Sequence, residues 1–119
     1  MERRILIIDD DAGARDALSS ILGDEGFDVI CVVGGREALD HLRSAPRPSV
    51  ILLDLTMPEM DGWEFRSAQK QDPSLCSIPV IVVSAAGPFD GTPIDDINVE
   101  IIRKPVDIEQ LLQAIQRYC

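Results

Sequence analysis

Five short apolar runs, separated by segments with helical spacing, constrain the fold of this chain more than any other feature of its sequence. The runs are rich in isoleucine and valine: Ile5–Ile8, Val29–Val33, Val50–Leu53, Val80–Val83 and Val99–Ile102. They are mostly unbroken rather than alternating with polar residues, which is typical of strands that are covered on both faces. Alternation of such strands with helices predicts an α/β fold with a parallel sheet, right-handed crossovers and helices on both faces.

Apolar residues recur at helical spacing in four of the segments outside these runs. The expected helices run from about Ala14 to Gly23, from Gly35 to near Pro46, from about Trp63 to Lys70, and from Asp107 onward. Gly23 is expected to end the first of them, and Asp107 is expected to be the N-cap of the last.

The segment between the fourth and fifth runs contains four helix breakers: Gly87, Pro88, Gly91 and Pro93. Both residue types destabilise the interior of a helix. We therefore expect the fourth helix of the fold, in the segment Gly87–Asn98, to be short or irregular.

Ionisable and hydroxyl side chains stand directly after several of the apolar runs. Asp9, Asp10 and Asp11 follow the first run, Asp54 the third, Ser84 the fourth, and Lys104 with Pro105 the fifth. Ligands of open α/β sheets bind outside the carboxyl ends of the strands. The sequence therefore predicts one crevice that gathers carboxylates, a hydroxyl and an ammonium.

This set of groups fits a phosphoryl acceptor that works with a metal ion. Two carboxylates about 4 Å apart repel by about 4 kcal/mol at an effective dielectric near 20, so a cation must offset them. Hard oxygen ligands suit Mg²⁺, with Mn²⁺ as an alternative. A carboxylate can take up a phosphoryl group as an aspartyl phosphate, with the metal, an ammonium and a hydroxyl stabilising the transferred oxygens. Asp54 is the predicted nucleophile because it follows the central strand, and Asp9 and Asp10 are the predicted metal-holding pair; Asp11 is interpreted as a helix cap or first-turn acid.

Composition excludes several other functions. Aspartate and glutamate total 21 against 11 lysines and arginines, which gives a formal net charge of −10 and argues against direct nucleic-acid binding by this chain. No apolar run approaches the length of a signal peptide core or a membrane span, so we expect no membrane association and a cytoplasmic location. The three cysteines, Cys31, Cys76 and Cys119, lack CxxC spacing and are interpreted as reduced thiols.

With these residues in place, the chain resembles the receiver domain of two-component response regulators, as a chemotaxis-regulator-like single domain, from about Arg4 to Tyr118. Four ordered segments carry the resemblance: Ile5 to Asp11, Leu52 to Gly62, Ile78 to Ala85, and Lys104 with Pro105. The resemblance implies a flavodoxin-like, doubly wound sheet of five parallel strands in the order 2-1-3-4-5. It also implies that residues 1–119 form a single receiver domain.

The resemblance assigns a role to each matching position. Asp54 accepts the phosphoryl group, and Ser84 and Lys104 contact its oxygens. Asp10 binds Mg²⁺ directly, Asp9 binds it partly through water, and the backbone carbonyl of Thr56 completes the protein ligands together with Asp54. The peptide bond before Pro105 is implied to be cis.

The implied function is a phosphorylation-dependent signalling switch rather than a turnover enzyme. The phosphoryl donor is a phosphohistidine on a histidine kinase or a histidine phosphotransfer protein, and the output is a changed surface for a downstream effector. The chain is expected to be a monomer or a phosphorylation-dependent dimer. Two alternatives remain: an interaction module that is never phosphorylated, and a haloacid-dehalogenase-like phosphohydrolase, against which Thr56 stands where that class places a proton-donating acid.

The chain departs from the receiver pattern at the output face. Ile101 stands three residues before Lys104, where the family usually has tyrosine or phenylalanine. Isoleucine is stiff at χ1 and has no aromatic face to bury or expose. We therefore expect output to use another surface, or a change of order in the segment Gly87–Asn98.

Overall fold

A computed structural model describes residues 3–44, 47–54, 62–84, 99–103 and 107–118 of the chain. In the described residues, strands and helices follow one another in this order: β1 (Arg4–Ile8), α1 (Ala12–Asp24), β2 (Asp28–Val32), α2 (Gly35–Ser44), β3 (Val50–Asp54), α3 (Gly62–Gln71), β4 (Val80–Ser84), β5 (Val99–Arg103) and α4 (Ile108–Gln116). Each of the five apolar runs is a strand, as the sequence predicts. The expected helix in Gly87–Asn98 and the Lys104–Pro105 bond lie outside the described residues.

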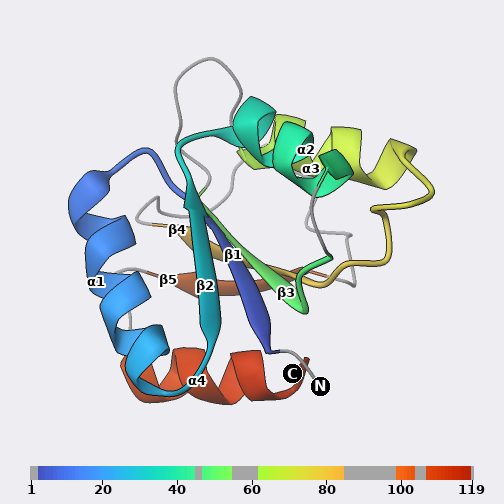
Figure 1. The fold of residues 1–119 in the computed structure, drawn as a ribbon. Helices are drawn as coiled ribbons and strands as arrows, with labels where there is room; N and C mark the ends of the chain where they lie inside the picture. The colour runs from blue at the N-terminus through green and yellow to red at the C-terminus, as the bar shows by residue number, and fades with distance from the viewer. Residues whose placement is uncertain (1–2, 45–46, 55–61, 85–98, 104–106, 119) are drawn as a thin grey trace.

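The five strands form one parallel sheet in the order β2-β1-β3-β4-β5 (Figure 1). This is the predicted order, with the chain running first to one edge of the sheet and then back past β1 to the other. All five residues of the central strand β3 are buried. A strand covered on both faces has no need of alternating polar residues, which explains its unbroken apolar sequence.

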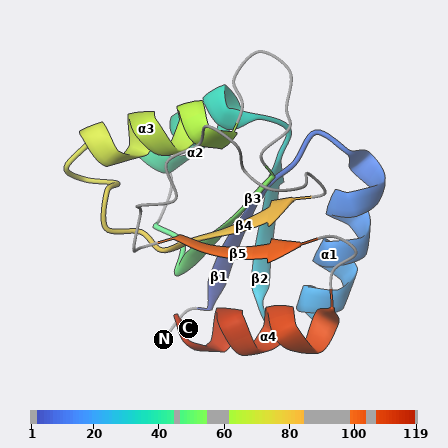
Figure 2. The same cartoon turned by 180° about the vertical axis from the view of Figure 1, so that it is seen from behind.

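Two hydrophobic layers cover the two faces of the sheet. Figures 1 and 2 show α1 and α4 on one face and α2 and α3 on the other. Side chains from alternate strand positions fill each layer: Ile5, Ile7, Val50 and Leu52 pack with α1 and α4, whereas Leu6, Ile8, Ile51 and Leu53 pack with α2 and α3. Burying one such side chain contributes about 1.5–3 kcal/mol, so these layers supply most of the stabilisation of the fold.

The first helix ends at Asp24, one residue later than the sequence suggests, and its cap is formed by other residues than expected. Gly23 lies inside α1, and Gly26 has the positive φ of 90° that lets the chain reverse. The amide of Gly26 donates to the carbonyl of Gly23, and the amide of Phe27 donates to the carbonyl of Leu22. This pair of hydrogen bonds is a Schellman motif, in which the residue after the cap has a positive φ and is most often glycine. The expectation that Gly23 ends the helix is therefore wrong.

The last helix begins as predicted. The carboxylate of Asp107 accepts hydrogen bonds from the amides of Glu109 (3.0 Å) and Gln110 (3.4 Å). Leu111, Ala114 and Ile115 of α4 are buried against the sheet. None of the helices in the described ranges combines the length and the apolar character that crossing a bilayer would require.

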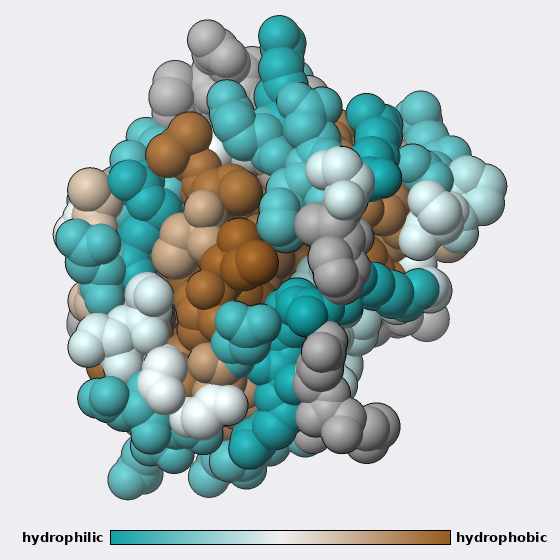
Figure 3. Space-filling model, viewed as in Figure 1, coloured by the Kyte–Doolittle hydropathy of each residue, from teal (hydrophilic) through white to brown (hydrophobic). Residues whose placement is uncertain are grey.

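The edge strand β2 lies at an apolar part of the surface. Its last four residues are half-buried, and Val33 directly after it is 49% exposed. Figure 3 shows apolar side chains gathered on this face of the molecule, between hydrophilic side chains on either side. This edge of the sheet therefore carries an apolar patch on the surface of the molecule.

Candidate functional site

The register of β1 and β3 brings two of the predicted acids side by side. Ile7 pairs with Leu52 and Ile8 with Leu53 in this parallel ladder, and Asp9 and Asp54 are the next residues along the two strands. Side chains of a strand alternate between faces, and Ile7 and Leu52 both point into the layer with α1 and α4. The same alternation places Asp9 and Asp54 on that face of the sheet, at its carboxyl edge.

Asp9, Asp10 and Asp54 form an acidic cluster. One carboxylate oxygen from each residue lies within 4.8 Å of the corresponding oxygens of the other two. Asp9 and Asp54 are buried, with 4% and 8% of their surface exposed, and Asp10 is exposed. The structure therefore brings together the three carboxylates that the sequence placed at one crevice.

Backbone hydrogen bonds fix the turn that carries Asp9 and Asp10. The amide of Asp9 donates to the carbonyl of Val32 at 3.2 Å, and the amide of Asp11 donates to Oδ1 of Asp9 at 2.9 Å. The carboxylate of Asp11 turns the other way and accepts from the amide of Gly13 at 3.0 Å. Asp11 is thus the N-cap of α1, which confirms its interpretation as a helix cap and leaves it outside the acidic cluster.

The donor set of the acidic cluster fits a hard divalent cation. Carboxylate oxygens are the ligands that Mg²⁺ prefers, and it commonly keeps several waters beside one or two carboxylates. A metal–oxygen distance of about 2.1 Å allows two ligand atoms to lie up to about 4.2 Å apart. The oxygens of the cluster, within 4.8 Å of one another, need only small side-chain rotations to reach that geometry.

The remaining predicted site residues are only partly described. Ser84 ends β4, where its backbone is in register with Arg103 of β5. Ile101 lies in β5 opposite Val82 of β4. Thr56 and Lys104 lie outside the described residues, so their roles stay predictions.

Sequence reasoning missed one residue that contacts the turn of the acidic cluster. Nη1 of Arg15 in α1 donates a hydrogen bond of 2.8 Å to the backbone carbonyl of Asp9. Its position in the sequence gave a signal: a cation near the first turn of a helix opposes the helix dipole. Such a cation needs a compensating acceptor, and Asp9 supplies one.

A buried polar network in α3 was also missed. Gln69 is fully buried and donates from Nε2 to the carbonyls of Leu75 (2.9 Å) and Ile78 (3.1 Å). Nη1 of Arg66, itself only 3% exposed, donates to Oε1 of Gln69 at 2.8 Å. The network ties the segment before β4 to α3, and it explains how two polar side chains can sit in the layer between α2, α3 and the sheet.

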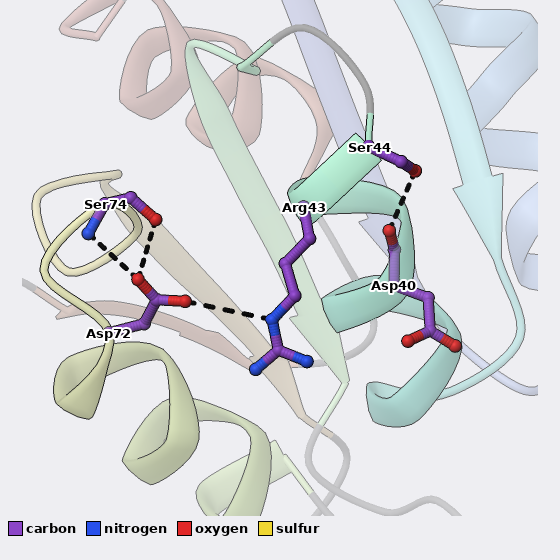
Figure 4. A network of polar contacts seen from close by, with 5 residues as sticks. All are labelled: Asp40, Arg43, Ser44, Asp72 and Ser74. Carbon is purple, nitrogen blue, oxygen red and sulfur yellow. Dashed lines mark hydrogen bonds and ion pairs between the residues drawn. The ribbon is translucent and has the colours of Figure 1, made fainter.

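A second polar cluster links α2 to the turn after α3 (Figure 4). Asp72 accepts from the amide (2.9 Å) and the hydroxyl (2.6 Å) of Ser74, and Nε of Arg43 lies 3.8 Å from its other oxygen. The hydrogen bonds from Ser74 and the charge of Arg43 hold the pKa of Asp72 below its ordinary value. In the same view, Ser44 donates to the carbonyl of Asp40 at the end of α2. These contacts fasten two helical segments together away from the acidic cluster.

Known proteins resemble this chain in sequence over almost its whole length. The chain is 32% identical to sporulation initiation phosphotransferase F of Bacillus subtilis (strain 168), an alignment that covers 99% of this chain and 94% of that protein. It is 41% identical to a protein-glutamate methylesterase/protein-glutamine glutaminase of Anaeromyxobacter dehalogenans (strain 2CP-C), over 88% of this chain. The chain spans only 30% of the length of that relative.

Solved structures agree with the sequence comparison. The chemotaxis protein CheY4 of Vibrio cholerae superposes with a TM-score of 0.85 at 28% identity, covering 100% of both chains. A CheY-like response regulator receiver domain protein of Methanospirillum hungatei JF-1 gives a TM-score of 0.83 at 33% identity, covering 97% of this chain and 92% of that one. Residues 5–116 match the family described as the response regulator receiver domain. With the strand order, the acidic cluster and these relatives in agreement, the chain belongs to the receiver domain family of two-component response regulators.

Proposed function

We propose that this receiver domain is a phosphorylation-dependent switch in which Asp54 accepts a phosphoryl group from a phosphohistidine. The donor is a histidine kinase or a histidine phosphotransfer protein. The observation that carries the proposal is the acidic cluster, in which the buried Asp54 ends the central strand with two further carboxylate oxygens within 4.8 Å. A receiver domain is a signalling domain, and in this proposal the chain is not a turnover enzyme.

In this proposal Asp9, Asp10 and Asp54, with the backbone carbonyl of Thr56, hold Mg²⁺, for which Mn²⁺ can substitute. When bound, the ion neutralises charge on the cluster and on the phosphoryl oxygens. A carboxylate oxygen of Asp54 attacks phosphorus, an O–P bond forms and the P–N bond to histidine breaks. The bonding electrons leave with the imidazole, which takes up a proton. Ser84 donates a hydrogen bond to a phosphoryl oxygen and Lys104 pairs with its charge, as their places in the sequence, at the end of β4 and directly after β5, suggest.

The assembly around the switch follows from the same proposal. Residues 1–119 act as a single receiver domain, as a monomer or as a dimer that forms on phosphorylation, in the cytoplasm. The phosphorylated domain presents a changed surface to an effector protein or domain. Direct nucleic-acid binding by this chain is not part of the proposal, because its formal net charge is −10.

Phosphoryl uptake tests the proposal directly. The protein is incubated with acetyl phosphate and Mg²⁺, and its intact mass is measured. We expect one phosphoryl adduct per chain, and no adduct on Asp54→Asn or in the presence of a chelator. Asp72→Asn removes an acid away from the acidic cluster and serves as the matched control, with uptake equal to that of the wild type.

Other outcomes point to the alternatives. A folded protein that takes up no phosphoryl group from acetyl phosphate or from a phosphorylated histidine phosphotransfer protein is an interaction module. Steady hydrolysis of a phosphate monoester, lost in Asp54→Asn, identifies a phosphohydrolase instead.

A further inference from the structure

We propose that Arg15 is a positioning residue for the acidic cluster: its guanidinium fixes the peptide between Asp9 and Asp10 and thereby directs the carboxylate of Asp10 toward Asp9 and Asp54. The inference rests on the proposed function, because it assigns Arg15 a part in holding the metal ion.

The carboxylate of Asp10 depends on its backbone for its direction. Its side chain is exposed, and within the described part of the chain no hydrogen bond or ion pair holds it. Asp9, by contrast, is buried and accepts a hydrogen bond at Oδ1 from the amide of Asp11. Because no such contact among the described residues holds the side chain of Asp10, its position depends on the direction in which the backbone sets its Cα–Cβ bond.

Arg15 controls that backbone through the carbonyl of Asp9. The carbonyl of Asp9, the amide of Asp10 and the Cα of Asp10 belong to one planar peptide unit. A hydrogen bond that holds the carbonyl oxygen therefore also holds the orientation of the backbone that leads into Asp10. The hydrogen bond from Nη1 of Arg15 is 2.8 Å long. Two further contacts on this turn, from the amide of Asp9 to Val32 and from the amide of Asp11 to Asp9, use backbone amides as donors, which a substitution does not remove. The hydrogen bond from Arg15, in contrast, comes from a side chain, so a substitution can remove its donor.

The structure also fixes Arg15 itself. Its amide donates to the carbonyl of Asp11 at 3.0 Å within the first turn of α1, and its side chain is half-buried. Cys31 of β2 lies close enough to the guanidinium for its charge to affect the thiol. Burial raises the pKa of the Cys31 thiol, and the charge of Arg15 acts against that rise. The guanidinium thus occupies a defined place between α1 and the ends of β1 and β2.

The sign of the effect on metal affinity separates positioning from simple charge. As a nearby positive charge, Arg15 opposes the binding of a cation, so its removal should tighten Mg²⁺ binding if charge were its whole role. If Arg15 positions Asp10, its removal weakens Mg²⁺ binding despite the lost repulsion. Partners one step beyond the metal ligands typically change metal affinity by about tenfold or more when they are replaced.

The experiment measures Mg²⁺ dissociation constants by isothermal titration calorimetry on the full chain. Arg15→Gln is expected to weaken Mg²⁺ binding by about tenfold, and Arg15→Lys is expected to recover part of the loss because it restores a donor. Arg36→Gln, at an exposed position of α2, makes the same change in net charge and is expected to bind like the wild type. The backbone amide signal of Asp10 in NMR spectra without metal should shift in Arg15→Gln and not in Arg36→Gln.

Each possible result either supports or overturns the inference. Mg²⁺ binding in Arg15→Gln that equals or exceeds that of the wild type overturns the inference and leaves the proposed function intact. A wild type that binds no Mg²⁺, or an Asp10→Asn variant that binds it unchanged, overturns the proposed function and the inference with it. If urea unfolding shows that Arg15→Gln is not folded, Arg15→Ala replaces it, with the same expected result, because alanine is the strongest helix former.

Discussion

The thiol of Cys31 offers an independent measure of where the charge of Arg15 lies. Burial raises its pKa, and the Arg15 guanidinium partly counteracts this, so Arg15→Gln should raise the pKa of Cys31 further. The pH dependence of alkylation by iodoacetamide measures this pKa in a Cys76→Ser, Cys119→Ser background. Arg36→Gln in the same background is the control, and a pKa of Cys31 that stays the same in Arg15→Gln would place the guanidinium elsewhere.

Asp72 gives the fold a small dependence on acid. Its pKa is lowered in the folded state, so the contact network contributes stability above the unfolded value of about 3.9 and loses it as the pH falls through the folded value. Asp72→Asn should therefore unfold more easily in urea than the wild type near neutral pH. The difference between the two proteins should shrink between about pH 5 and pH 3. A difference that stays constant over this range would show that the charge of Asp72 contributes nothing.

At the scale of the elements, the buried hydrogen bonds of Gln69 contribute to the stability of the fold. Gln69→Leu leaves the carbonyl of Ile78 without its donor, deprives the carbonyl of Leu75 of the donor it has besides the amide of Ile78, and removes an acceptor from Arg66. Unsatisfied buried polar groups cost about 1–3 kcal/mol each, so we expect a loss of about 2–4 kcal/mol in the free energy of unfolding. Gln71→Leu, at an exposed position of the same helix, is the control and should change stability by less than about 0.5 kcal/mol. A loss below that level in Gln69→Leu would mean that water or rearranged side chains satisfy these groups.

Removal of the N-cap of α4 should lower the stability of the protein by a limited amount. Asp107→Ala deletes the acceptor for the amides of Glu109 and Gln110 and should lower the free energy of unfolding by about 1 kcal/mol. Asp107→Asn keeps an oxygen acceptor and should retain most of the stability. Urea unfolding distinguishes the two, and equal losses in both variants would assign the effect to charge rather than to capping.

Elements were predictable from the sequence where one residue type has one physical use. Uniform isoleucine and valine runs meant strands covered on both faces, and an aspartate before an apolar helical pattern meant an N-cap, as Asp11 and Asp107 show. Gly23 misled because glycine is tolerated inside a helix, and only the backbone shows that Gly26 takes the positive φ. Gln69 gave no signal, because its burial depends on carbonyls contributed by a later segment of the chain.

For the whole molecule, the acidic cluster is a source of strain in the absence of a cation. Three carboxylates with oxygens within 4.8 Å of one another repel, so Asp10→Asn should stabilise the metal-free protein at neutral pH. The gain should be only about 1 kcal/mol, because Asp10 is exposed and solvent screens the repulsion. The same variant should lose most of the rise in melting temperature that Mg²⁺ gives the wild type, because a ligand stabilises only the state that binds it. Thermal unfolding with and without Mg²⁺ measures both effects.

Asp11→Asn is the matched control for that experiment. It removes one negative charge next to the acidic cluster, and asparagine caps a helix as well as aspartate does. It should leave the Mg²⁺-dependent rise in melting temperature unchanged. Equal behaviour of the two variants would show that general charge, and not the acidic cluster, governs metal binding.

The candidate site could be predicted in outline because it follows from topology. In a parallel sheet the carboxyl ends of neighbouring strands meet at one edge, so Asp9, Asp10 and Asp54 had to converge once the strands were recognised. The contact between Arg15 and the carbonyl of Asp9 could not be predicted in the same way. It depends on how closely α1 approaches the end of β1, and many residue spacings are compatible with a helix there.

The shared face of Asp9 and Asp54 has a consequence for how this protein tolerates changes in length. β1 and β3 carry apolar side chains toward both layers, so a deletion of one residue upstream of Asp54 would leave a strand that still satisfies the core. The same deletion would send the carboxylate of Asp54 to the layer of α2 and α3, away from Asp9. Burial of apolar side chains drives formation of the sheet, but the number of residues in each strand determines on which face the carboxylates lie. Insertions and deletions in these strands are therefore a harsher test of the switch than substitutions at the same places.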